Sequence, residues 1–347
     1  MDLPILRQAQ VTVLPKPYLL FLGDITEKSF AKTALGLVDW AAELCIGELV
    51  VEGATVTAGL EGMSAEEAVR AGAKSVVIGV ANQGGIIPES WRGALADAME
   101  AGLDVVSGLH TPLGSIPLLA ETAKRTGRRL IDIRRPPLDL PVGTGRKRTG
   151  KRLLTVGTDC ALGKKYTALA ISRAFRERGQ DVDFRATGQT GIMISGSGIP
   201  MDAVVSDFES GAAEVLSPDA APDHWDVIEG QGSLFNPAYA AVSLGLLHGS
   251  QPDVFVVCHD PTRETIIGLE GYKLPSVEEV IDLTVRLGSL TNPAIRCAGI
   301  SMNTSCFSED QAEEVLAEYS ERLHGMPVAD PIRGGPAFTR LIDSCLV

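Results

Sequence analysis

One stretch limits the fold of this chain more than any other: RLLTVGTDCALGKKYTALAISRAF, residues 152–175. A hydrophobic strand pattern runs into a turn bounded by Gly157 and Gly163. The turn leads into a helical pattern that begins with Lys164 and Lys165. The first amides of a helix point at an anion held by such a turn, and two cations there oppose the helix dipole unless an anion is present. The stretch therefore predicts a phosphate-binding loop.

The residue after the Gly-Lys pair departs from the usual motif. Ser or Thr normally stands there, because its hydroxyl holds the Mg²⁺ of a nucleoside triphosphate, but this chain has Lys165. A cation at that position replaces the metal, and a diphosphate with no phosphoryl group to transfer suits it. No metal ligand is assigned. The candidate cofactor-binding residues of the loop are Gly157, Thr158, Gly163, Lys164, Lys165, Tyr166 and Thr167.

Strand and helix patterns alternate along the whole chain, which predicts parallel strands with helical crossovers. The segment 136–150 is rich in Pro, Gly and charge and has no periodicity, as at a domain boundary. We expect an N-terminal Rossmann-like doubly wound sheet at 1–135, a linker at 136–150 and a P-loop NTPase-like α/β domain at 151–347. The expected strands are 18–23, 48–53, 75–81, 103–108, 129–134, 152–157, 181–187, 225–230, 253–260 and 296–303.

Composition narrows the class of protein further. The net charge of −13 opposes general nucleic-acid binding. The six cysteines have no close metal-ligand spacing, and MDLPILRQAQ has no signal-peptide form, so a reducing cytoplasm is expected. The longest uncharged runs are broken by polar residues and Pro, so no membrane span is predicted. Partners should be small molecules, and a homo-oligomer is common for doubly wound enzymes of this size.

The loop is longer than the standard motif, since five residues separate Gly157 from Gly163 where four are usual. This form resembles the loop of dethiobiotin synthetase. VIEGQGSLFNP at 227–237 and GISMNT at 299–304 extend the likeness. The resemblance implies that Asp159 and Glu229 surround Mg²⁺ and that Asn303 reads adenine. Lys165 departs from this metal-binding pattern, so an ATP-dependent ligase or kinase of this type is kept as the alternative.

A wider resemblance covers both expected domains. VGTDCALGKKYTALA, ATGQTGIMISGSGIPMDAVVSDF, VIEGQGSLFNPAYAAVSLGLLHGSQPD and VVCHDPTR are similar, in order and spacing, to a two-domain family formerly catalogued as a domain of unknown function. Some members are D-glutamate N-acetyltransferases. The likeness is dense after residue 150 and looser before it. It implies transfer of the acetyl group of acetyl-CoA, as a cosubstrate, to the amine of D-glutamate in D-amino-acid catabolism.

Acyl transfer to an amine needs a base, an oxyanion partner and groups that bind the acceptor's carboxylates. The candidate bases are Asp159, Glu229 and His259, each at the expected carboxyl end of a strand. The plainer alternatives are a helix cap or the orientation of Lys164 for Asp159, an ion pair with Lys165 for Glu229, and a turn histidine for His259.

Three residues are candidates for acceptor binding. Arg263 is the first choice because a guanidinium binds carboxylates in a bidentate way, and a surface ion pair is its alternative. Gln189 and Thr190 lie in a GQTG turn at another strand end. A tight bend would also explain the glycines of that turn.

Three further features carry weaker hypotheses. Cys160 lies in the loop, but a small packing residue is favoured over a nucleophile. His110 follows a strand in SGLHTPLG, where a structural and a catalytic role are equally open. The basic stretch from Lys124 to Arg152 is expected to be mostly solvated, with contact to a phosphate of CoA as the alternative.

Overall fold

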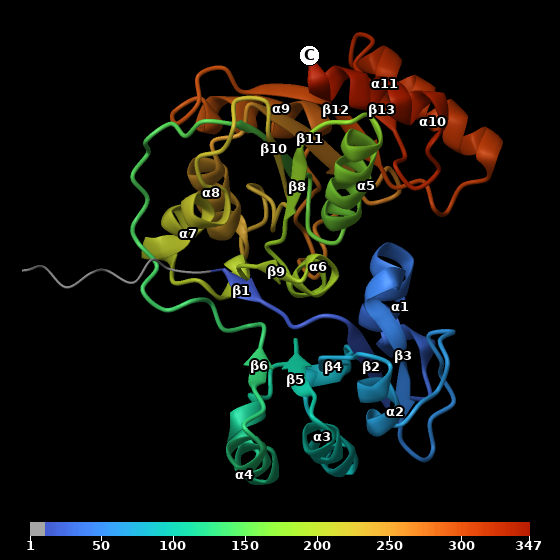
Figure 1. The fold of residues 1–347 in the computed structure, drawn as a ribbon. Helices are drawn as coiled ribbons and strands as arrows, with labels where there is room; N and C mark the ends of the chain where they lie inside the picture. The colour runs from blue at the N-terminus through green and yellow to red at the C-terminus, as the bar shows by residue number, and fades with distance from the viewer. Residues whose placement is uncertain (1–10) are drawn as a thin grey trace, which may run out of the picture. The chain divides into compact units, whose positions relative to one another are not determined.

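The structure is a computed structural model, and it describes residues 11–347 (Figure 1). The amino-terminal sequence MDLPILRQAQ, which bears on the signal-peptide expectation, lies outside the described residues. The chain forms two compact units. We call Thr12–Pro136 with Gln189–Ala203 the N-terminal unit, and Pro137–Gly188 with Val204–Val347 the C-terminal unit.

The N-terminal unit is built on a parallel sheet with strand order β3-β2-β4-β5-β6. All six residues of YLLFLG in β2 are buried, as is typical of a parallel strand that is covered on both faces. The strands are β2 (Tyr18–Gly23), β3 (Cys45–Val50), β4 (Ser75–Ile78), β5 (Asp104–Ser107) and β6 (Leu130–Asp132). The helices between them are α1 (Lys32–Ala41), α2 (Ala65–Arg70), α3 (Glu89–Ala101) and α4 (Pro117–Thr126).

A segment far along the sequence also belongs to the N-terminal unit. It contains α6 (Gln189–Ser195), which packs against α1, and β9 (Ser197–Gly198), which pairs antiparallel with β1 (Thr12–Val13). The expected GQTG turn is therefore wrong, because a helix begins at Gln189. The expected division into 1–135, 136–150 and 151–347 does not include this excursion of the chain.

The C-terminal unit has a parallel sheet with strand order β13-β12-β11-β7-β10-β8. The order reverses at β7, so the loop after β7 lies among the carboxyl ends of β10, β11 and β12, where doubly wound sheets bind ligands. The strands are β7 (Lys151–Gly157), β8 (Val182–Arg185), β10 (Trp225–Ile228), β11 (Val254–His259), β12 (Arg296–Met302) and β13 (Val328–Ala329). The helices are α5 (Lys164–Glu177), α7 (Glu209–Leu216), α8 (Ala240–Ser250), α9 (Val277–Gly288), α10 (Glu309–Arg322) and α11 (Gly335–Leu346).

The segment 137–150, which we call the arm, has no helix or strand but is fixed to the C-terminal unit. Arg148 is buried and donates hydrogen bonds to the carbonyl oxygens of Ser217 and Gly249, both at 2.7 Å. Arg152 is fully buried at the start of β7 and donates to Ser217 Oγ at 2.7 Å. The expectation of a mostly solvated basic stretch is therefore wrong for these two arginines, because backbone carbonyls replace their water.

The predicted fold class is confirmed: both units are α/β structures with parallel sheets. Helix starts follow the expected chemistry, since Ser276 and Ser308 form capping boxes at the first turns of α9 and α10. Among residues 11–347, no helix combines the length and the apolar character that crossing a bilayer requires.

Candidate functional site

The phosphate-binding loop follows β7 and joins it to α5. Gly163 precedes α5 with a φ of 94°, in the left-handed region that a side chain rarely adopts. At the other end of the loop, a Cβ on Gly157 would lie 3.0 Å from the carbonyl oxygen of Cys258 in β11. The positive φ favours glycine at position 163, and a side chain at position 157 would have to displace the backbone of β11 slightly. The strand-turn-helix geometry of the loop is the one that the sequence predicted.

The two lysines at the start of α5 lie in different surroundings. Lys164 is buried, and its Nζ donates to the carbonyl oxygen of Asp159 at 2.7 Å. Burial lowers the pKa of Lys164. Lys165 places its Nζ 4.3 Å from the centroid of the Tyr166 ring. Thr167 bonds Ser301 Oγ at 2.7 Å inside the unit, so its hydroxyl is engaged away from the loop.

Asp159 is a structural anchor of the loop. Its fully buried carboxylate accepts from Asn236 Nδ2 at 2.9 Å, from the Ile267 amide at 2.7 Å and from Arg263 Nη1 at 3.2 Å. Burial raises the pKa of Asp159, but the hydrogen bonds from Ile267 and Asn236 and the charge of Arg263 outweigh it, so the pKa is lowered. An ionised carboxylate with these three donors is a poor proton acceptor.

Arg263 binds the loop that Asp159 anchors. Besides the Asp159 carboxylate, Nη1 contacts the carbonyl oxygen of Cys160 at 2.7 Å. The carboxylate that Arg263 meets in this structure is therefore one of the protein's own. The Cys160 thiol is half-buried, and burial raises its pKa, which opposes a thiolate nucleophile.

Glu229 follows β10 and faces the end of β8. Its Oε2 accepts from the amides of Thr187 at 2.9 Å and Gly188 at 3.0 Å. The next residue, Gly230, donates its amide to Thr155 Oγ1 at 2.9 Å, and a Cβ there would lie 1.6 Å from the carbonyl oxygen of Thr155. This position tolerates only glycine, and it draws the turn after β10 against β7.

His259, the last residue of β11, connects two hydroxyl groups. Its Nδ1 lies 3.0 Å from Thr158 Oγ1, and its Nε2 lies 3.1 Å from the hydroxyl of Tyr319 in α10. Burial lowers the pKa of His259 to about 4, so the ring is neutral at physiological pH. The sequence did not indicate Tyr319, because a tyrosine inside a helical pattern carries no motif.

Asn303, Gln189 and Thr190 complete the predicted set. Asn303 follows β12; its amide donates to the carbonyl oxygen of His259 at 2.9 Å, and its Oδ1 accepts from the Ser305 amide at 3.2 Å. Gln189 and Thr190 begin α6 in the N-terminal unit. The structure therefore gathers the other predicted site residues at the carboxyl edge of the C-terminal sheet and places these two in the other unit.

Comparison with known proteins follows the same two-part division. Residues 141–341 match the family model described as "Domain of unknown function (DUF1611_C) P-loop domain", and residues 49–136 match "Domain of unknown function (DUF1611_N) Rossmann-like domain". The chain belongs to the DUF1611 family. Its P-loop and Rossmann-like domains correspond to the fold classes predicted for the two halves.

Two curated relatives and one solved structure support this membership. A D-glutamate N-acetyltransferase from Pseudoalteromonas sp is 51% identical over 92% of this chain and 96% of its own. Another from Tritonibacter scottomollicae is 47% identical over 96% of this chain and 99% of its own. The crystal structure of a DUF1611 family protein from Anabaena variabilis ATCC 29413 is 31% identical, with a TM-score of 0.81 over 95% of this chain and 99% of that one. The predicted resemblance to the D-glutamate N-acetyltransferase family is confirmed.

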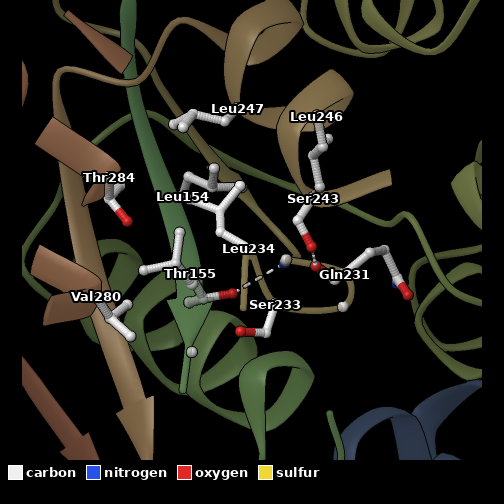
Figure 2. A pocket seen from close by; sticks show the side chains of 14 residues that line it. Leu154, Thr155, Gln231, Ser233, Leu234, Ser243, Leu246, Leu247, Val280 and Thr284 are labelled. Carbon is white, nitrogen blue, oxygen red and sulfur yellow. Dashed lines mark hydrogen bonds between the residues drawn. The ribbon is translucent and has the colours of Figure 1, made fainter. Parts of the chain in front are cut away.

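A small cavity lies beside β7 in this DUF1611 protein (Figure 2). It measures about 20 Å³ and is bounded by β7, the turn 230–234, α8 and α9. Thr284 lines this cavity, and its buried hydroxyl has no hydrogen-bond partner among the residues that the structure describes. The volume suits a single water molecule, so the cavity is too small for a cosubstrate.

Within residues 11–347, one cluster has the spacing of a metal site: Asp183, His224 and Asp226 near β8 and β10. Protein groups already engage these side chains. Arg185 Nε donates to Asp226 Oδ1 at 2.6 Å, and Arg185 Nη2 lies 3.0 Å from Asp183 Oδ2. The guanidinium thus supplies the positive charge that this cluster needs, and the cluster is explained as an ion-pair network.

Proposed function

We propose that this chain is a D-glutamate N-acetyltransferase that uses acetyl-CoA and acts in D-amino-acid catabolism. The observation that carries the proposal is the 51% and 47% identity to two curated D-glutamate N-acetyltransferases over nearly the whole chain. Cytoplasmic location and self-association stay predictions. The D configuration of the acceptor comes from those relatives' names.

The phosphate-binding loop fits the diphosphate of acetyl-CoA. Lys164 lies inside the loop with a backbone carbonyl as its hydrogen-bond partner, so a phosphate oxygen would offer it a stronger, charge-assisted bond. The space beside Gly163 is open, since a Cβ there would meet no atom within 4 Å. In this proposal Lys164 binds a phosphate oxygen, and Lys165 with Tyr166 lies at the rim.

The surroundings of Asp159 support acyl transfer over ATP chemistry. In the ATP-dependent alternative, Asp159 would help to hold Mg²⁺, but its carboxylate accepts from Asn236, Ile267 and Arg263. A metal ligand in that position would have to lose these bonds. We therefore assign Asp159 and Arg263 to holding the loop in shape, as positioning residues.

The reaction forms a carbon–nitrogen bond and breaks the carbon–sulfur bond of the thioester. Two protons must leave the acceptor's ammonium group: one reaches the departing thiolate, and the other is released to solvent. We assign His259 to this proton transfer, because its ring is neutral and bonded to two hydroxyls, Thr158 and Tyr319. Glu229, bonded to the amides of Thr187 and Gly188, is assigned to shaping the adjoining turn.

The test is a thiol-release assay on the purified full-length protein. With acetyl-CoA and D-glutamate together, we expect free CoA and N-acetyl-D-glutamate to appear in equal amounts. Neither product should form when D-glutamate is left out, and L-glutamate should react more slowly. Consumption of ATP with Mg²⁺ in place of acetyl-CoA would support the ligase alternative and overturn the proposal.

The same assay tests the role of His259. Replacing His259 with Gln keeps a hydrogen-bonding side chain but removes the group that exchanges a proton. General acid–base groups contribute roughly 100- to 10,000-fold to a rate, so kcat should fall in that range while the KM for acetyl-CoA stays within about twofold. An unchanged kcat would exclude His259 from the proton transfer.

A further inference from the structure

Two adjoining cavities lie at the carboxyl ends of β4, β5 and β6 in the N-terminal unit. They measure about 170 Å³ and 330 Å³, and both are lined by Leu109, His110 and Arg134. Asn82 and Gln189 also line the first, and Asp132 and Asp202 the second. The carboxyl edge of an open parallel sheet is where such folds bind small ligands. The proposed function assigns no role to the side chains that line these two cavities.

Arg134 is held in place between the two cavities. Its Nε donates to the carbonyl oxygen of Gly108 at 2.9 Å, and its Nη1 lies 3.2 Å from Asp202 Oδ2. When the side-chain amide of Gln189 is flipped, both of its polar atoms have partners. The nitrogen donates to the carbonyl oxygen of Gly108, and the oxygen accepts from the guanidinium of Arg134. A guanidinium has five N–H groups, so these three partners fix its position and leave an N–H of Nη2 for a ligand carboxylate.

Asp132 brings a negative charge to the larger cavity. Its side chain is 10% exposed, its Oδ1 accepts from the Leu113 amide at 2.9 Å, and Arg135 Nε lies 3.6 Å from its Oδ2. Burial raises the pKa of Asp132, against the Leu113 hydrogen bond and the charge of Arg135. A ligand ammonium group would favour the ionised form of this carboxyl.

The cavities therefore present both signs of charge to a ligand. Arg134 and Arg135 attract carboxylates, whereas Asp132 and Asp202 attract an ammonium group and repel a phosphate. We propose that this site binds the acceptor amino acid, with Arg134 on one of its carboxylates and Asp132 on its ammonium group. The inference rests on the proposed function for the identity of the amino acid, but the recognition of an acidic amino acid follows from the charges of the site.

The test measures binding of two ligands to the full-length protein by titration calorimetry, without acetyl-CoA. D-glutamate carries an ammonium group and two carboxylates, and glutarate has the same two carboxylates without the ammonium group. Arg134→Lys should weaken both ligands at least tenfold, because it keeps the charge but loses the planar guanidinium that Gly108 and Gln189 hold in position. Asp132→Asn should weaken D-glutamate at least tenfold and leave glutarate unchanged or tighter.

The chain offers a matched control at the opposite edge of the same sheet. Arg129 Nε lies 2.7 Å from Asp104 Oδ2 at the amino ends of β5 and β6. Neither residue lines either cavity. Arg129→Lys should therefore leave the affinity for both ligands unchanged, and thermal melting of all three variants checks that each is folded.

Kinetics separate this site from a structural role and from the proposed function. If the wild-type protein acetylates D-glutamate, Arg134→Lys should raise the KM for D-glutamate at least tenfold and the KM for acetyl-CoA less than twofold. Equal rises in both KM values, or no rise in either, would overturn the site.

The site and the proposed function can also fail separately. If the wild-type protein has no acetyltransferase activity but binds D-glutamate through Arg134, the proposed function fails and the site stands. If it acetylates D-glutamate while the Arg134 and Asp132 variants bind normally, the function stands and the site fails.

Discussion

Lys164 is buried in the C-terminal unit, and no carboxylate of residues 11–347 forms a salt bridge with its ammonium group. Its hydrogen-bond partner is the carbonyl oxygen of Asp159, and burial lowers its pKa. A buried ammonium group in such surroundings costs folding free energy. Binding of an anion would recover that cost, which is the physical basis of the phosphate contact that we propose for Lys164.

Replacing Lys164 with Met keeps the aliphatic part of the side chain and removes the charge. A hydrogen bond to a charged group contributes about 1.5–3 kcal/mol, so acetyl-CoA should bind that much more weakly in calorimetry. The melting temperature should not fall, because the substitution also removes a buried charge. Lys151→Met, at the amino end of β7, is the control; equal affinity in Lys164→Met would contradict the phosphate-binding assignment.

The sequence allowed site residues to be predicted where they follow a strand, but not where they lie on the face of a helix. Glu229, His259 and Asn303 each follow a hydrophobic strand pattern, so parallel strands had to bring them to one edge. Tyr319 reaches His259 from α10, 60 positions further along the chain. The spacing of residues within one helical pattern contains no information about which strand end that helix meets.

At the scale of elements, a glycine in α7 allows the arm, which has no helix or strand, to pack directly against that helix. Gly211 lies inside α7, and a Cβ there would be 1.8 Å from the carbonyl oxygen of Pro141. Glu214, one turn later, accepts hydrogen bonds from the amides of Thr144 and Gly145 at 2.9 and 3.0 Å. The arm therefore packs on the helix backbone itself, through atoms that any side chain at 211 would displace.

Gly211→Ala should destabilise the C-terminal unit, although alanine is the better helix former. Forcing a methyl group into a packed contact costs about 1–3 kcal/mol, which urea unfolding monitored by fluorescence can measure. Gly93→Ala in α3 is the matched control, because its Cβ would meet no atom within 4 Å. That control should be neutral or stabilising by up to about 1 kcal/mol. If Gly211→Ala raised the free energy of unfolding as well, the arm would not pack against α7 at this residue in solution.

For the whole molecule, the sequence indicated two α/β parts because alternation of strand and helix patterns restarts after residue 150. It did not indicate that Gln189–Ala203 belongs to the N-terminal unit. The excursion is held by α6 against α1 and by the short pairing of β9 with β1. Two-residue strands such as Ser197–Gly198 are too short to have a recognisable hydrophobic period.

His224 makes the stability of the C-terminal unit depend on pH. Its Nδ1 lies 2.8 Å from Asp181 Oδ2 and its Nε2 3.2 Å from Asp226 Oδ1. Burial lowers the pKa of His224, but the hydrogen bonds to Asp181 and Asp226 outweigh it, so the pKa is raised above its ordinary value of about 6.5. Its contribution is therefore fully present below about pH 6.5 and is lost as the pH rises through the folded-state pKa.

The expected result is a free energy of unfolding that falls between about pH 6.5 and the raised pKa. His224→Gln should flatten this part of the pH profile, while His324→Asn, at an exposed position, should leave it unchanged. Denaturant unfolding at several pH values gives the profile. A wild-type curve that rises across this window would contradict the proposed partners of His224.

The excursion also determines how the protein can be divided. The chain passes from one unit to the other after Pro136, after Gly188 and again after Ala203. A protease that cuts the arm would therefore leave Gln189–Ala203 covalently attached to the C-terminal unit, and only noncovalent contacts would hold this segment to Thr12–Pro136. For the same reason, recombination could not exchange one unit as an uninterrupted cassette, because the gene for the C-terminal unit contains a piece of its neighbour.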